Sequence, residues 1–159
     1  MLTINEYRKV ESLEEAYELN QKKNNKSIAG GVWMKIGDRR IATAIDLSGL
    51  GLDQITETDT EFVIGAMTTL REIEKHAGLA AYTDGAIRES VRHIVGVQFR
   101  NCATVGGSIF GRFGFSDVLT VFLAMATQVE LYHAGMVSLK DFIDMTYDND
   151  ILVTLHVTK

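Results

Sequence analysis

The sequence of 159 residues contains no proline and only one cysteine, Cys102. A single thiol cannot close a disulfide within the chain, and a single thiolate cannot hold an iron–sulfur cluster. Any cluster that exchanges electrons with this protein must therefore be held by another chain. The four histidines lack the spacing of metal ligands, so we predict no metal site in the chain itself. No histidine lies near Cys102 in the sequence to activate it, and we predict no catalytic residue.

Positive charge and long apolar runs are also scarce. The chain has 16 lysines and arginines against 21 acidic residues, a net charge of −5. Broad nucleic-acid binding needs a cationic face that displaces counterions from phosphates, so we expect no nucleic-acid partner. The longest apolar run, residues 118–126, is too short to cross a bilayer, and the N-terminus does not resemble a signal peptide. We therefore expect a cytoplasmic protein that does not enter the membrane.

Hydrophobic periodicity and turn residues predict strands and helices along the whole chain. Ser12 and Glu15 have the spacing of a capping box, and Gly78 is placed to end a helix in a left-handed conformation. Residues 96–114 are rich in glycine and lack regular periodicity. We expect strands over residues 3–10, 26–29, 42–47, 54–58, 61–66, 128–133 and 151–157, and helices over 13–22, 32–35, 70–77, 84–95, 118–126 and 139–145.

This pattern predicts an α+β fold. A glycine-containing turn at residues 49–53 is the expected boundary between two α/β lobes, residues 1–52 and 53–159. The length suits either one medium domain or two small lobes that share a cleft.

Glycine is plentiful, with 14 residues, and two glycine pairs stand in informative places. Gly30-Gly31 lies between a predicted strand and a predicted short helix. Backbone amides at such a helix start suit a pyrophosphate, because they lack partners and the helix dipole favours negative charge. A plain tight turn is the alternative. The spacing is neither that of a Gly-x-Gly-x-x-Gly dinucleotide motif nor that of a Walker A loop.

The second pair, Gly106-Gly107, is flanked by Thr104 and Ser108 within the stretch RNCATVGGSIFGRFGFSD, residues 100–117. Hydroxyls beside paired glycines can donate to phosphate oxygens where the bare backbone approaches closely. We therefore predict that Thr104, Ser108 and the amides of both glycines hold a pyrophosphate. Ser116-Asp117 begins the next predicted helix, either as a simple N-cap or with Asp117 accepting from a ribose hydroxyl or an adenine amine.

The pattern Arg-Asn-x-Ala-Thr-Val-Gly-Gly-Ser-Ile, followed by Ser-Asp and an apolar helix, resembles the FAD-binding segment of the molybdopterin dehydrogenase family. That family includes the flavin subunits of xanthine dehydrogenase and carbon monoxide dehydrogenase. The resemblance covers nearly the whole chain and implies two α/β lobes with FAD between them. It also implies an oxidoreductase component that relays electrons from an iron–sulfur partner through FAD to NAD⁺ or another acceptor. A molybdopterin-binding subunit is the second implied partner.

The resemblance also implies which residues contact the cofactor. They lie in a first segment, residues 27–33, in a second segment, residues 104–111, and in the Ser-Asp pair that follows it. One more residue, on the last strand, would lie against the flavin. These residues are Ser27, Ile28, Ala29, Gly30, Gly31, Val32 and Trp33; Thr104, Gly106, Gly107, Ser108, Phe110 and Gly111; Ser116 and Asp117; and Leu152.

The chain departs from the family pattern at two points. Val32-Trp33 replaces a usual polar pair, so only backbone donors remain in the first segment. The family's flavin subunits carry a further C-terminal domain, which would begin where this chain ends. Both departures keep open an alternative function, a flavin-free relative that acts as an assembly or binding module. Arg112, Phe113 and Phe115 have two readings as well: a loop anchored by two buried rings, or a contact with a partner subunit or a nicotinamide nucleotide.

Overall fold

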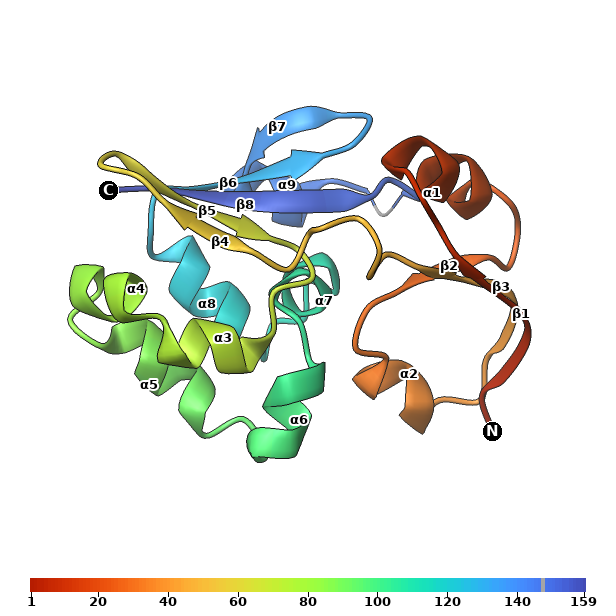
Figure 1. The fold of residues 1–159 in the computed structure, drawn as a ribbon, viewed down its shortest axis with the longest axis horizontal. Helices are drawn as coiled ribbons and strands as arrows, with labels where there is room; N and C mark the ends of the chain where they lie inside the picture. The colour runs from red at the N-terminus through yellow and green to blue at the C-terminus, as the bar shows by residue number, and fades with distance from the viewer. Residues whose placement is uncertain (147) are drawn as a thin grey trace.

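The computed structural model describes residues 1–146 and 148–159, and its strands form two separate sheets (Figure 1). The first is a 3-stranded parallel sheet in the order β1-β3-β2. The second is a 5-stranded antiparallel sheet in the order β4-β5-β8-β6-β7. The strands are β1 (Thr3–Lys9), β2 (Lys26–Ile28), β3 (Arg40–Asp46), β4 (Ile55–Glu57), β5 (Glu61–Gly65), β6 (Thr127–Leu131), β7 (Gly135–Ser138) and β8 (Leu152–Thr158).

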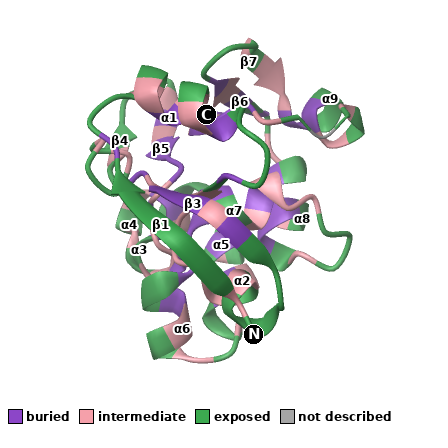
Figure 2. Ribbon diagram, turned by 90° about the vertical axis from the view of Figure 1, so that its right-hand side faces the viewer, coloured by how far each residue is buried: buried purple, intermediate pink, exposed green. Residues whose placement is uncertain are grey.

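The first sheet is connected by two helices, α1 (Leu13–Asn20) and α2 (Val32–Ile36). Figure 2 shows β1 as an exposed strand at the edge of this sheet, whereas β3, in its middle, is largely buried. The hydroxyl of Ser12 accepts from the Glu15 amide at 3.1 Å, as predicted. The Glu15 carboxylate accepts from the amide of Glu11 instead of Ser12, so the predicted capping box is only half formed.

The second sheet is covered by a layer of short helices, which lies below it in Figure 1. Alternation along β8 explains the packing: Leu155 and Val157 are fully buried, while Thr154 and His156 between them are only partly buried. Phe62, Phe122 and the buried faces of the helices complete this core. The helices of this layer are α3 (Leu70–Lys75), α4 (Ala77–Tyr82), α5 (Ala86–Arg92), α6 (Val97–Cys102), α7 (Val105–Phe110) and α8 (Asp117–Leu123). A further helix, α9 (Leu139–Asp144), lies beside β6 and β7.

Helix α1 contacts two loops of the second sheet, the loop between β6 and β7 and the loop before β8. The side chain of Asn20 donates to the carbonyl of Asn149 at 2.7 Å, and Tyr17 stacks on His133 at 5.4 Å between centroids. Ile151 packs in the small core beside β3 and α1. The division at residues 49–53 falls between the two sheets, but the segment before β8 returns to the first one. The domain limits 1–52 and 53–159 remain a prediction.

Several expectations about single elements were wrong. The predicted helix 70–77 ends at Lys75, because the ring nitrogen Nδ1 of His76 accepts from the Leu79 amide at 3.1 Å and starts α4. Gly78 lies inside α4 and does not end a helix. Residues 96–114 contain α6 and α7, two helices too short for periodicity to reveal. The edge strand β7 was not expected, because it has only four residues and pairs with β6 alone.

Candidate functional site

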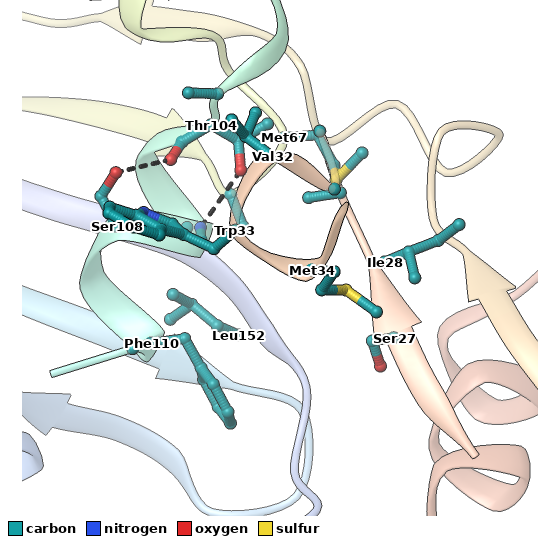
Figure 3. A pocket seen from close by; sticks show the side chains of 18 of the residues that line it. Ser27, Ile28, Val32, Trp33, Met34, Met67, Thr104, Ser108, Phe110 and Leu152 are labelled. Carbon is teal, nitrogen blue, oxygen red and sulfur yellow. Dashed lines mark hydrogen bonds between the residues drawn. The ribbon is translucent and has the colours of Figure 1, made fainter. Parts of the chain in front are cut away.

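The three-stranded sheet with α1 and α2 forms one α/β unit, and the five-stranded sheet with its helices forms the other. A cavity of about 870 Å³ is lined by residues from both α/β units. This volume lies in the upper part of the range found for small-molecule and cofactor sites. Every residue predicted to contact the cofactor lines it: Ser27, Ile28, Ala29, Gly30, Gly31, Val32, Trp33, Thr104, Gly106, Gly107, Ser108, Phe110, Gly111, Ser116, Asp117 and Leu152. Figure 3 shows labelled side chains of both segments around this space. Residues that are far apart in the sequence are therefore brought together.

The first segment reaches the cavity because β2 ends at Ile28 and the chain turns through two glycines into α2. Gly30 lies so close to the second segment that an added Cβ would be 1.7 Å from the Cys102 carbonyl oxygen. Gly31 has φ +65°, and no side chain caps α2. The first amides of a helix have no intrahelical acceptor. The start of α2 therefore offers backbone donors at the cavity, and their contact with a phosphate stays a prediction.

The second segment is more tightly tied into the protein than the sequence suggests. The Gly106 amide donates to the Ala66 carbonyl at 2.9 Å, and an added Cβ at Gly106 would lie 2.5 Å from that oxygen. Gly106 therefore packs α7 against the end of β5, and its amide is not a bare phosphate donor. The physical reason is that α7 needs this close approach to bury Val105 and Ile109.

Thr104 and Ser108 also make hydrogen bonds within the segment, drawn as dashed lines in Figure 3. The Thr104 hydroxyl oxygen accepts from the Gly107 amide at 3.1 Å, which makes Thr104 the N-cap of α7. The Ser108 hydroxyl donates to the Thr104 carbonyl at 3.0 Å. Gly107 itself is exposed. The Thr104 hydroxyl hydrogen and, after rotation, the Ser108 hydroxyl are the groups of this segment that can donate to a ligand.

Ser116 caps a helix, whereas Asp117 remains available to contact a ligand. The Ser116 hydroxyl accepts from the Leu119 amide at 3.1 Å and caps α8, so its capping role is confirmed. Asp117 is exposed in the first turn of α8 and lines the cavity. Its carboxylate can accept from a ligand hydroxyl or amine, which keeps its predicted contact with a ribose or an adenine as a prediction.

Arg100 is the first residue of the stretch 100–117, and it positions the second segment. Its side chain is only 6% exposed and pairs with Glu74 at 2.8 Å, which ties α6 to α3. It also donates to the Ile94 carbonyl at 3.1 Å. Hydrogen bonds from Arg71 and then from Arg100 lower the pKa of the Glu74 carboxyl below its ordinary value. The pair fixes the helix that leads directly into Thr104.

The loop after α7 is anchored, as one alternative predicted, but not by two buried rings. The Arg112 guanidinium stacks over the Phe142 ring at 4.0 Å and donates to the Met145 carbonyl, so Arg112 anchors the loop. Phe113 and Phe115 are exposed, so the expectation of two buried rings is wrong. Their rings turn instead towards Trp33 of α2, across the cavity, at 6.3 and 6.0 Å between centroids.

Several cavity residues were not anticipated. Most are apolar and come from elements that carry no recognisable motif, so no local pattern could have marked them. Two are cationic, Lys26 and Arg39. The apolar ones include Met34, Ile36, Met67, Leu70, Ile94, Val95 and Phe99.

In residues 1–146 and 148–159 there is no group of three or more histidine, cysteine or acidic side chains that could hold a metal ion. Within the same residues, no helix has the length and apolar character needed to cross a membrane.

Comparison with known proteins agrees with the sequence motifs. Residues 3–157 match the sequence profile described as the FAD binding domain in molybdopterin dehydrogenase. The chain is 27% identical over 148 residues to the uncharacterized protein YgfM of Escherichia coli K12, covering 88% of this chain and 54% of that protein. The chain thus spans about half the length of this curated relative.

Solved structures share the fold. A carbon monoxide dehydrogenase chain from Hydrogenophaga pseudoflava has TM-score 0.86 and 26% identity, over 96% of this chain and 58% of that one. Quinoline 2-oxidoreductase from Pseudomonas putida 86 has TM-score 0.84 and 18% identity, over 96% and 58%. The predicted fold class is confirmed by these neighbours. Because the family profile matches almost the full chain, this protein belongs to the family of FAD binding domains in molybdopterin dehydrogenase, whose cofactor is FAD.

Proposed function

We propose that this chain holds FAD in the cavity between its two α/β units, as the flavin part of a molybdenum hydroxylase or dehydrogenase of the xanthine dehydrogenase type. One observation carries the proposal. Two segments about 70 residues apart line one cavity, and Gly30 of the first meets the Cys102 carbonyl of the second with no room for a Cβ. Such close backbone approach is what a glycine pair makes possible.

The residues present fit a dinucleotide. Above Gly31 an added Cβ would meet nothing within 4 Å, so the backbone there is open to a ligand. The α2 amides and the Thr104 hydroxyl supply donors for phosphate oxygens. Two cationic residues, Lys26 and Arg39, line the same cavity, together with the acidic residues Asp117, Asp148 and Asp150. The Asp150 carboxylate is directed elsewhere, because it accepts from the amides of His133, Ala134 and Ile151.

FAD supplies the redox chemistry when bound, taking electrons from an iron–sulfur partner and passing them to NAD⁺ or another acceptor. The chain itself binds, orients and shields the cofactor. The amides at the start of α2 and the Thr104 hydroxyl would donate to the phosphates, and Leu152, Met34 and Phe110 line the cavity with apolar surface. No side chain is assigned to acid–base catalysis, since position and electrostatics are what the protein contributes.

Anaerobic titration of the purified chain with FAD tests the proposal. We expect saturable binding and a yellow protein, with one flavin for each chain. A pull-down with this chain as bait should then recover subunits that hold iron–sulfur clusters and molybdopterin. The absence of saturable FAD binding would contradict the proposal.

The second candidate function is a flavin-free assembly module, and one observation favours it. The Gly106 and Gly107 amides already have acceptors inside the protein, so the second segment is held without a ligand. Recovery of the same partner subunits by a chain that binds no FAD would support this function over the first.

A further inference from the structure

Three aromatic rings meet at the cavity from opposite sides. Trp33 lies in the first turn of α2, and Phe113 and Phe115 lie in the loop between α7 and α8. The two phenylalanine rings stack with centroids 5.2 Å apart and planes at 15°. Trp33 approaches Phe115 edge-on, with an interplanar angle of 63°. All three residues line the cavity, and we call them the aromatic platform.

The three rings of the platform are exposed to solvent. Trp33 is 58% exposed, Phe113 43% and Phe115 69%, although the rings already contact one another. Aromatic side chains contribute most of their stabilisation when their large apolar area leaves water. Exposed apolar clusters of this kind mark ligand or partner sites. The position of these rings, on the wall of the proposed cofactor cavity, favours a ligand in that cavity.

The neighbouring groups indicate what kind of ligand. Trp33 comes two residues after Gly31, within the same helical turn as the amides proposed to hold phosphate. A molecule that places a phosphate at those amides and extends along the cavity wall brings its next group to the indole. Flat aromatic faces bind flat heteroaromatic rings by stacking, which tolerates differences in ring identity. The chemistry that this site recognises is therefore a planar ring attached to a phosphate.

We propose that the aromatic platform stacks against a planar ring of the dinucleotide and sets how tightly the cavity retains it. The inference rests on the proposed FAD binding. Both the isoalloxazine and the adenine carry such a face, and the platform takes one of them. The cross-cavity contact also makes the subsite depend on both α/β units, because Trp33 and the phenylalanines come from different ones.

The test compares Trp33→Ala and Phe115→Ala with Trp33→Phe, which keeps a flat ring. The dissociation constant for FAD is measured by titration calorimetry on the full chain. Loss of one stacking partner weakens nucleotide binding by about 10- to 100-fold, and we expect that loss for both alanine variants. Trp33→Phe should stay within about 3-fold of the parent. Met136→Ala is the matched control, because Met136 is 47% exposed on β7 and does not line the cavity.

Fragments identify the ring. ADP and riboflavin 5′-phosphate are each titrated into the parent and the Trp33→Ala variant. Trp33→Ala should weaken the binding of only one of these two fragments. That fragment carries the ring that stacks on the platform. Inorganic pyrophosphate, which has no ring, should bind both proteins equally.

The outcomes separate the two proposals. If the parent binds FAD and the two alanine variants bind it equally well, the platform inference is overturned while the function stands. If the parent binds no FAD, the proposed function fails, and the platform falls with it. A changed sedimentation coefficient in Trp33→Ala with unchanged FAD affinity would make the rings a protein interface and would also overturn the inference.

Discussion

The α-carbon of Gly30 lies against the backbone of Cys102, where an added Cβ would be 1.7 Å from the carbonyl oxygen. Gly30→Ala must therefore push the β2–α2 turn away from the α6–α7 turn. We expect a loss of about 1–3 kcal/mol in the free energy of unfolding, as for other overpacked sites, together with weaker FAD binding. Urea denaturation and FAD titration measure both.

Gly37→Ala is the matched control for this prediction. Gly37 ends the same helix, and an added Cβ there would meet only the Met34 carbonyl at 3.6 Å. Its stability and FAD affinity should match the parent. Equal behaviour of the two alanine variants would contradict the proposed close approach of the cofactor segments.

Gly107 is the exposed glycine of the second segment, and an added Cβ would meet only the Thr104 hydroxyl at 3.2 Å. Gly107→Asp should therefore fold, but its carboxylate would stand at the cavity wall. Two like charges about 4 Å apart repel by about 4 kcal/mol at an effective dielectric constant of about 20. We expect FAD affinity to fall by at least about 100-fold, as measured by fluorescence titration.

Ala81→Asp adds the same charge on the exposed surface of α4 and serves as the control. It should bind FAD like the parent. Undiminished flavin uptake by Gly107→Asp would count against a phosphate near α7.

At the scale of elements, the ion pair between Glu74 of α3 and Arg100 of α6 holds the second segment in place. Hydrogen bonds from Arg71 and Arg100 lower the pKa of Glu74 below its ordinary 4.5. A lowered pKa in the folded state stabilises the protein above that ordinary value, and the contribution is lost as the pH falls through the lowered pKa. The free energy of unfolding should therefore decline on acidification below about pH 4.5.

Glu74→Gln should remove this part of the pH dependence. At neutral pH the variant leaves a guanidinium that is 6% exposed without its carboxylate, which costs about 3 kcal/mol. Urea denaturation between about pH 3 and pH 7 measures both effects. Glu89→Gln breaks an exposed pair with Arg92 and should cost less than about 1 kcal/mol. If the stability of the parent and of Glu74→Gln changed with pH in the same way, Glu74 would not be the source of this pH dependence.

At the scale of the whole molecule, FAD that binds between the two units should stabilise them together. A ligand at 100 times its dissociation constant adds about 2.7 kcal/mol to the folded state. For a chain of this size, that corresponds to a rise in the unfolding midpoint of about 5–10 °C. Differential scanning calorimetry should show a single transition that moves upward with FAD. An unchanged midpoint at saturating FAD would show that FAD does not bind preferentially to the folded protein, which would contradict the proposed function.

Much of this fold follows from local patterns. The strand before Gly30 and the two strands expected over residues 54–58 and 61–66 were predicted because alternation and turn chemistry act over a few residues. The hydroxyl–glycine segment at Thr104–Ser108 was also recognisable, since its residue types are unusual together. The capping roles of Ser12 and Ser116 follow from the same short-range logic.

Other features depend on contacts that no local pattern contains. The Gly106 amide donates to Ala66, some 40 residues earlier in the chain, and His76 caps α4 where a longer helix was expected. The sequence by itself therefore determined which segments carry glycines and hydroxyls suited to a dinucleotide, because those are properties of neighbouring residues. Only the tertiary structure decided which amides remain available and that Trp33 meets Phe113 and Phe115, because both depend on how two distant units pack.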